Sequence, residues 1–150
     1  MDKTAFLVLH GPNLNMLGIR EPDVYGSISL KELNMRLLGL AQQLDVELRI
    51  SQSNQEGVLI DLIQDAFEWA SGVILNPGGY THTSIAIRDA IAAIHIPVIE
   101  VHLSNVSARE EFRRHSMIAP VCKGTIAGFG WLSYKLAILA LTDLVRSDEH

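Results

Sequence analysis

Residues 72–82 read Gly-Val-Ile-Leu-Asn-Pro-Gly-Gly-Tyr-Thr-His, an apolar run followed by a polar, turn-forming cluster. The same arrangement occurs twice more, where residues 5–9 precede the cluster 10–15 and residues 96–99 precede the cluster 100–105. Short continuous apolar runs are typical of strands that are covered on both faces of a parallel sheet. If the three runs are such strands, the three clusters lie at one edge of one sheet, where open α/β proteins bind ligands.

Further β-type runs bring the number of predicted strands to five. The run at residues 46–51 alternates between apolar and polar residues, which predicts a strand at the edge of the sheet. Helical patterns separate the runs, so strand and helix alternate along the whole chain. The predicted strands are 4–9, 46–52, 72–76, 97–102 and 124–128.

The helical segments carry apolar residues at the spacing of one helix face. Ser29 and Glu32 form a capping box, which predicts the start of a helix. The last helix, over residues 131–145, is apolar nearly all round, so we expect it to pack on its own sheet and on a second surface such as a neighbouring subunit. The three apolar stripes are Leu30, Leu33, Leu37, Leu40, Ala41 and Leu44; Leu59, Leu62, Ile63, Ala66, Phe67 and Ala70; and Ile87, Ala90, Ile91 and Ile94.

Five strand and helix units in 150 residues predict a single domain over 1–150 with an α/β fold. Among the doubly wound arrangements we favour a flavodoxin-like five-stranded parallel sheet with strand order 2-1-3-4-5. In this order the first and third strands are neighbours at the switch point, so the clusters 10–15 and 76–82 face each other across a crevice.

The composition indicates which classes of partner and which cellular compartment to expect for this protein. The net charge of −5 disfavours a nucleic-acid partner, and no apolar stretch reaches membrane-spanning length. A single cysteine, Cys122, excludes an internal disulfide and fits a reducing compartment. No secretion signal opens the chain, so we expect a cytoplasmic protein. The hydrophobic fraction of 48% indicates surface that is buried between subunits of a homo-oligomer.

The first cluster and the segment after it offer amides, a guanidinium and a phenol. The side-chain amide of Asn13 can donate to a developing oxyanion, although Asn, Gly and Pro are also ordinary turn formers. Residues 17–26 make a connection long enough to form a lid. Within it, the guanidinium of Arg20 would lower the pKa of the Tyr25 phenol, which could then act as a base. The alternative is a solvated arginine and a partly buried tyrosine.

Glu100 and His102 stand two residues apart on a predicted strand and therefore point to the same face. A carboxylate beside an imidazole can fix its tautomer and raise its pKa, which makes a competent proton donor. Two alternatives stay open: a structural ion pair, and half of a metal site completed by His82 or His10. No spacing of metal ligands is recognisable, so we expect no metal.

The chain after the third cluster is suited to binding an anion. The backbone amides of residues 103–105 and the hydroxyl of Ser104 could hold a carboxylate. Arg109 and Arg113 are four residues apart and share a helical face, so Arg113 could clamp an oxygenated ligand. The alternative is a solvated basic face that pairs with neighbouring glutamates.

Several familiar catalytic machineries are missing from the sequence. It holds no phosphate-binding P-loop, no complete dinucleotide fingerprint and no nucleophile elbow, so we expect no cofactor. None of the lysines falls in the three clusters, which disfavours Schiff-base chemistry. The groups that remain suit proton abstraction beside a carbonyl, with the oxyanion held by amides and a leaving hydroxyl protonated by histidine.

Five motifs, in order along nearly the whole chain, resemble those of the type II 3-dehydroquinate dehydratase family. That family has the flavodoxin-like fold, acts in the shikimate and quinate pathways, and assembles as a dodecamer built from trimers. The resemblance implies a lyase of aromatic amino acid biosynthesis that takes 3-dehydroquinate as substrate. The alternative is a non-catalytic flavodoxin-like module that binds a small anion. The motifs are His-Gly-Pro-Asn-Leu-Asn at 10–15, Gln-Ser-Asn-Gln-Glu-Gly at 52–57, Asn-Pro-Gly-Gly-Tyr-Thr-His at 76–82, Glu-Val-His-Leu-Ser-Asn at 100–105 and Arg-Glu-Glu-Phe-Arg at 109–113.

The resemblance also implies a role for each site residue. Tyr25, activated by Arg20, would remove a proton from carbon 2 of 3-dehydroquinate, and Asn13 would stabilise the resulting enolate. His102, oriented by Glu100, would protonate the departing carbon-1 hydroxyl, giving 3-dehydroshikimate and water by an anti elimination. The implied binding residues are Asn76, His82 and Arg113 for the substrate hydroxyls, the amides of Leu103 and Ser104 for the carboxylate, and Asp89, which would reach the site of a neighbouring subunit.

Overall fold

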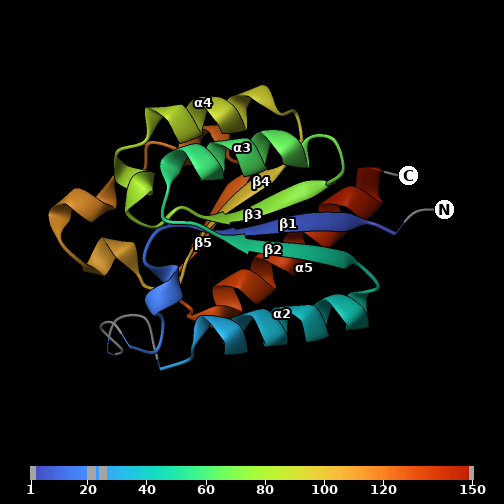
Figure 1. Ribbon diagram of the computed structural model, residues 1–150, viewed down its shortest axis with the longest axis horizontal. Coiled ribbons are helices and arrows are strands. Elements are labelled where there is room, and N and C mark those ends of the chain that lie inside the picture. Colours follow the sequence, from blue (N-terminus) through green and yellow to red (C-terminus); the bar gives the residue numbers. More distant parts are fainter. Residues whose placement is uncertain (1–2, 20–22, 24–26, 149–150) are drawn as a thin grey trace.

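The computed structural model describes residues 3–19, 23 and 27–148, and it places a five-stranded parallel sheet between two layers of helices (Figure 1). The strand order is β2-β1-β3-β4-β5, which confirms the predicted flavodoxin-like arrangement. Each strand lies within one residue of its predicted bounds. The strands are β1 (Ala5–His10), β2 (Glu47–Gln52), β3 (Gly72–Asn76), β4 (Val98–His102) and β5 (Gly124–Ala127).

The three central strands, β1, β3 and β4, are buried along their whole length, as their continuous apolar sequences predict. The alternating strand β2 lies at one edge of the sheet, which also agrees with the prediction. The register of the sheet places the polar residues at the carboxyl ends of β1, β3 and β4 beside one another. His10 is paired with Asn76, and Leu75 is paired with Glu100 on the next strand. The three polar clusters therefore leave the sheet at the same edge.

Within residues 27–148, two helices cover each face of the sheet (Figure 1). Helices α2 (Leu30–Leu44) and α5 (Trp131–Asp148) lie on one face, and α3 (Glu56–Ala66) and α4 (Ile85–Ala93) lie on the other. The predicted cap of α2 is present, because Ser29 Oγ accepts a hydrogen bond of 3.1 Å from the amide of Glu32. Each pair of helices buries its own apolar core against the sheet.

The predicted stripes face these two cores with one exception. Phe67 is half exposed although its backbone is still helical, since it lies at the border of the stripe that Leu59, Ile63 and Ala66 form. On α5 the predicted second apolar face is present, and it exposes Leu132, Leu136 and Leu139. None of the helices in the described part of the chain is both long and apolar enough to cross a membrane.

Short 3₁₀ turns follow the carboxyl ends of the central strands. The segment after β4, where the arginine spacing suggested a regular helix, is instead divided into two such turns. Arg109 lies between them and Arg113 lies in the second, so the two do not share a helical face. The turns at this edge are η1 (Leu14–Met16), η2 (Gly78–His82), η3 (Val106–Ala108) and η4 (Glu111–Arg114); η5 (Ala119–Val121) follows before β5.

Candidate active site

A pocket lies at the sheet edge where β1, β3 and β4 end, and all three predicted clusters line it. This is the switch point of the sheet, since β1 and β3 are neighbours there. The predicted residues that line the pocket are Asn13, Asn76, His82, His102, Leu103, Ser104 and Arg113. Pro12, Leu14, Met16, Leu17, Gly78, Gly79, Val106 and Arg109 complete the lining.

The other predicted site residues occupy three different situations. Glu100 does not line the pocket but lies behind His102, where it is 1% exposed. Asp89 is exposed on α4 and is absent from the lining of this pocket. Its predicted role toward a neighbouring subunit stays a prediction. Arg20 and Tyr25 lie outside the described residues.

Two glycines allow the first and second clusters to pack backbone against backbone. The amide of Gly11 donates a 2.7 Å hydrogen bond to the carbonyl of Asn76. A Cβ on Gly11 would lie 2.7 Å from the carbonyl carbon and oxygen of Pro77, which is too close for any side chain. Gly78 has a φ of 59°, a conformation that favours glycine, and its Cβ position lies 2.9 Å from the Pro12 carbonyl. The sheet edge thus fixes the two loops against each other.

Asn13 has a left-handed backbone conformation, with a φ of 71°. The backbone N–H of Asn13 donates a 3.0 Å hydrogen bond to Oδ1 of Asn54, in the loop after β2. Gln52 Nε2 donates to the same Asn54 oxygen and to the Gly11 carbonyl, at 3.1 Å each. The motif at 52–57 therefore supports the turn that carries Asn13. The sequence predicted no role for it, because only the fold brings this loop beside the first cluster.

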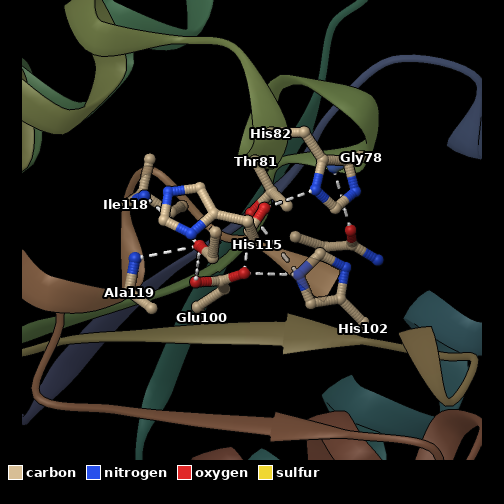
Figure 2. A network of polar contacts seen from close by, with 10 residues as sticks. Gly78, Thr81, His82, Glu100, His102, His115, Ile118 and Ala119 are labelled. Carbon is tan, nitrogen blue, oxygen red and sulfur yellow. Dashed lines mark hydrogen bonds and ion pairs between the residues drawn. The ribbon is translucent and has the colours of Figure 1, made fainter. Parts of the chain in front are cut away.

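The carboxylate of Glu100 is the centre of a buried polar network (Figure 2). Its Oε2 lies 2.5 Å from Nε2 of His102 and accepts a 2.6 Å hydrogen bond from Thr81 Oγ1. Its Oε1 accepts a 2.8 Å hydrogen bond from Ser116 Oγ. Burial by itself would raise the pKa of Glu100, but the hydrogen bonds from His102, Thr81 and Ser116 outweigh burial and lower it. Glu100 is therefore an ionised group that binds the imidazole.

The tautomer of His82 is set by a neighbouring carbonyl. Nδ1 of His82 lies 2.8 Å from the backbone oxygen of His115, as Figure 2 shows. Because a carbonyl oxygen only accepts, Nδ1 carries the proton. In the neutral ring, Nε2 is then an acceptor that can take a hydrogen bond from a ligand hydroxyl.

Two arginines and one glutamate meet at the edge of the pocket. Arg113 Nε forms an ion pair with Glu110 Oε2, and Arg109 Nε lies 4.0 Å from the same oxygen. The arginine side chains are mostly covered, with exposed fractions of 20% for Arg113 and 14% for Arg109, whereas Glu110 is 54% exposed. Pairing with a neighbouring glutamate, which the sequence left open, does occur. Both arginines nevertheless line the pocket and can bind an oxygenated ligand.

A metal site at Glu100 and His102 finds no support in the geometry. In the described part of the chain, no three His, Cys, Asp or Glu side chains lie close enough together to hold a metal ion. The two histidines that the sequence offered as further ligands have other partners. Nδ1 of His82 binds the His115 carbonyl, and the two ring nitrogens of His10 bind the side chains of Tyr134 and Asn34.

Comparison with known proteins gives one consistent result. A family model described as dehydroquinase class II matches residues 4–142. The 3-dehydroquinate dehydratase of Exiguobacterium sp. (strain ATCC BAA-1283 / AT1b) is 63% identical over 141 residues, which cover 94% of this chain and 96% of the relative. That of Gloeothece citriformis (strain PCC 7424) is 54% identical over all 150 residues and 99% of the relative. The crystal structure of type II dehydroquinase from Butyrivibrio crossotus DSM 2876 matches with a TM-score of 0.92 at 47% identity, covering 93% of this chain and 97% of that one.

Proposed function

The chain belongs to the class II dehydroquinase family, and we propose that it dehydrates 3-dehydroquinate to 3-dehydroshikimate by anti elimination through an enolate in this pocket. The observation that carries the proposal is the meeting of Asn13, the Glu100–His102 pair and the Leu103–Ser104 turn around a single pocket. This combination offers an oxyanion donor, a proton donor and a carboxylate site at once.

The proton donor in this reaction is His102. Because Glu100 binds Nε2, the nitrogen available to a ligand is Nδ1. A protonated His102 delivers the Nδ1 proton to the carbon-1 hydroxyl, whose carbon–oxygen bond breaks to release water. The ionised carboxylate of Glu100 stabilises the imidazolium before transfer and holds the ring during it.

The base is Tyr25, activated by Arg20, an assignment that rests on the family resemblance because both residues lie outside the described ones. The phenolate takes a proton from carbon 2, and the electron pair moves onto the carbonyl oxygen as an enolate. Asn13 donates to that oxygen. When the electrons return, the carbon-1 hydroxyl leaves with the proton of His102. A proton transferred from Tyr25 to His102 through solvent restores the enzyme, so protons balance over one turnover.

The remaining lining residues bind the substrate. The carboxylate lies against the amides of Leu103 and Ser104, and the hydroxyls are held by Asn76, His82 and Arg113. For His82 the acceptor nitrogen Nε2, left by the bond of Nδ1 to His115, supports this role. These contacts are neutral or cationic, which suits an anion that is rich in hydroxyl groups.

The assembly, compartment and pathway complete the proposal. We place residues 1–150 in one catalytic domain of a cytoplasmic enzyme of the shikimate pathway, assembled as a dodecamer built from trimers. The exposed face of α5, formed by Leu132, Leu136 and Leu139, supports burial between subunits. In the assembly, Asp89 would contact the pocket of a neighbouring subunit.

The test is the appearance of the conjugated product by absorbance when the purified protein is mixed with 3-dehydroquinate. We expect the wild-type protein to form the product, and Tyr25→Phe and Arg20→Gln each to reduce turnover by roughly 10²- to 10⁴-fold while remaining folded. Wild-type protein that binds the substrate without forming product would favour the non-catalytic binding module. Light scattering on the same sample measures the size of the assembly.

A further inference from the structure

A chain of buried polar side chains leads from helix α5 to the wall of the pocket. Tyr134 on α5 and His10 at the end of β1 are each 0% exposed, and neither has a part in the reaction described above. Nδ1 of His10 lies 2.9 Å from the Tyr134 hydroxyl, and Nε2 of His10 lies 2.8 Å from Oδ1 of Asn34 on α2. Tyr134 is also hydrogen-bonded to the side chain of Asn76, which lines the pocket.

Each hydrogen bond in this series of side chains has a defined donor and a defined acceptor. Because Asn34 Oδ1 only accepts, Nε2 of His10 carries the ring proton. Burial lowers the pKa of His10 to about 4, so the ring is neutral near pH 7 and Nδ1 has no proton. Nδ1 therefore accepts the hydroxyl proton of Tyr134, at 2.9 Å. Because the Tyr134 hydroxyl donates its proton to His10, the phenol oxygen can only accept a hydrogen bond from the side-chain NH₂ group of Asn76.

The other end of the Asn76 side chain is fixed as well. Its Oδ1 accepts a 3.1 Å hydrogen bond from the amide of Gly78. If the side-chain amide turned over, its NH₂ group would face the Gly78 N–H, and its oxygen would face a phenol with no proton to give. Two independent contacts thus select one orientation of the amide, and this orientation determines which Asn76 atoms a ligand meets.

We propose that Tyr134 and His10 are positioning residues that hold the Asn76 amide in the orientation needed to bind a substrate hydroxyl. The inference rests on the proposed function, in which Asn76 contacts the substrate. It assigns a role to two buried polar groups whose removal would otherwise affect only stability. Neither residue touches the substrate, since neither lines the pocket.

The test is the kinetics of Tyr134→Phe, which removes only the hydroxyl. Because the substrate hydroxyl is bound in both ground and transition states, we expect KM to rise by roughly 5- to 10-fold with kcat within about twofold of wild type. In the background of Asn76→Ala, Tyr134→Phe should have no further effect on KM, since the group on which it acts is gone. The matched control is Thr142→Val, which removes another buried hydroxyl of α5 that donates 2.7 Å to the Ile138 carbonyl and should leave KM unchanged.

Two variants of His10 give an independent measurement if Tyr134→Phe folds poorly. Asparagine can place an acceptor oxygen near the position of Nδ1, so His10→Asn should keep KM within about twofold, whereas His10→Leu should raise it as Tyr134→Phe does. Equal KM values for the two His10 variants would overturn the inference. So would a folded Tyr134→Phe with unchanged KM, or one that raises KM equally with and without Asn76. Failure of the wild-type protein to form product would instead contradict the proposed function, so the two failures are distinguishable.

Discussion

Thr81 Oγ1 lies 2.6 Å from Glu100 Oε2, the same carboxylate oxygen that binds Nε2 of His102. Thr81 belongs to the turn after β3, whereas Glu100 and His102 belong to β4. One polar cluster therefore supports the proposed proton donor of another, and the contact exists only because β3 and β4 are neighbours in the sheet. The hydroxyl stabilises the ionised carboxylate and helps to fix its direction.

Replacing Thr81 with valine should weaken catalysis and change its pH dependence. Hydrogen bonds lower the pKa of Glu100, so loss of the bond from Thr81 raises that pKa. The Glu100–His102 pair is then protonated at a higher pH than in the wild-type protein. We expect kcat/KM to fall roughly 10-fold and the acidic limb of its pH profile to move to higher pH. The control is Thr83→Val, which removes an exposed hydroxyl two residues away. Identical profiles for wild type and Thr81→Val would contradict the role.

Asn54 should influence turnover more than substrate binding. Its Oδ1 accepts a hydrogen bond from the backbone amide of Asn13, which has a left-handed conformation that asparagine adopts more readily than most other residues. We expect Asn54→Ala to lower kcat roughly 10-fold with little change in KM, because in the proposed reaction Asn13 binds the enolate. Asn54→Asp keeps an acceptor oxygen and should retain most of the activity. Steady-state kinetics of the two variants test the idea, and equal losses would count against it.

Substitutions at Gly11 and at Gly39 form a matched comparison that tests the close packing of the loops after β1 and β3. A Cβ at Gly11 meets the Pro77 backbone at 2.7 Å, whereas nothing lies within 4 Å of a Cβ at Gly39 on the exposed face of α2. We expect Gly11→Ala to destabilise the protein and reduce activity, since the backbone must move. Gly39→Ala should stabilise it by about 0.5–1 kcal/mol through better helix propensity. Urea unfolding measures both, and a stable, fully active Gly11→Ala would contradict the expectation.

His10 should make the protein less stable in acid. Burial lowers the pKa of His10 from 6.5 to about 4, so between these values the unfolded chain binds a proton that the folded protein does not. The free energy of unfolding therefore falls as pH drops from about 6.5 to about 4, by about 3 kcal/mol from this residue. Urea unfolding at several pH values should show a smaller dependence in His10→Asn than in wild type. Parallel curves for the two proteins would show that His10 does not contribute.

The sequence was sufficient to predict the sheet because its signals are local. Continuous apolar runs mark β1, β3 and β4. The rules for strand and helix crossovers reduce the possible strand orders to a few, and the flavodoxin-like order is the one favoured among them. The edge position of β2 follows from its alternation. The prediction for Phe67 was wrong because a residue at the border of an apolar stripe keeps the helical spacing and can still face water. How far a core extends around a helix depends on the elements packed against it, which the spacing of apolar residues does not record.

The supporting residues of the site escaped prediction because their signals are long-range. Asn54 lies 41 residues from Asn13, and Tyr134 lies 124 residues from His10. Tyr134 occurs within a helix that is apolar nearly all round, where a buried tyrosine is typical of a core residue. Only the fold shows that its hydroxyl is directed at the end of β1. Local motifs predicted the lining of the pocket, whereas the groups that support it required the contacts between elements.

The ion pair of Glu110 with Arg113 also bears on how an oxygenated ligand enters the site. The guanidinium of Arg113 is largely enclosed, whereas its partner carboxylate on Glu110 is 54% exposed. Because an ion pair with an exposed carboxylate contributes little free energy, an oxygenated ligand can replace Glu110 at the arginine at small cost. Glu110 thereby compensates the charge of a largely enclosed guanidinium until a ligand takes its place.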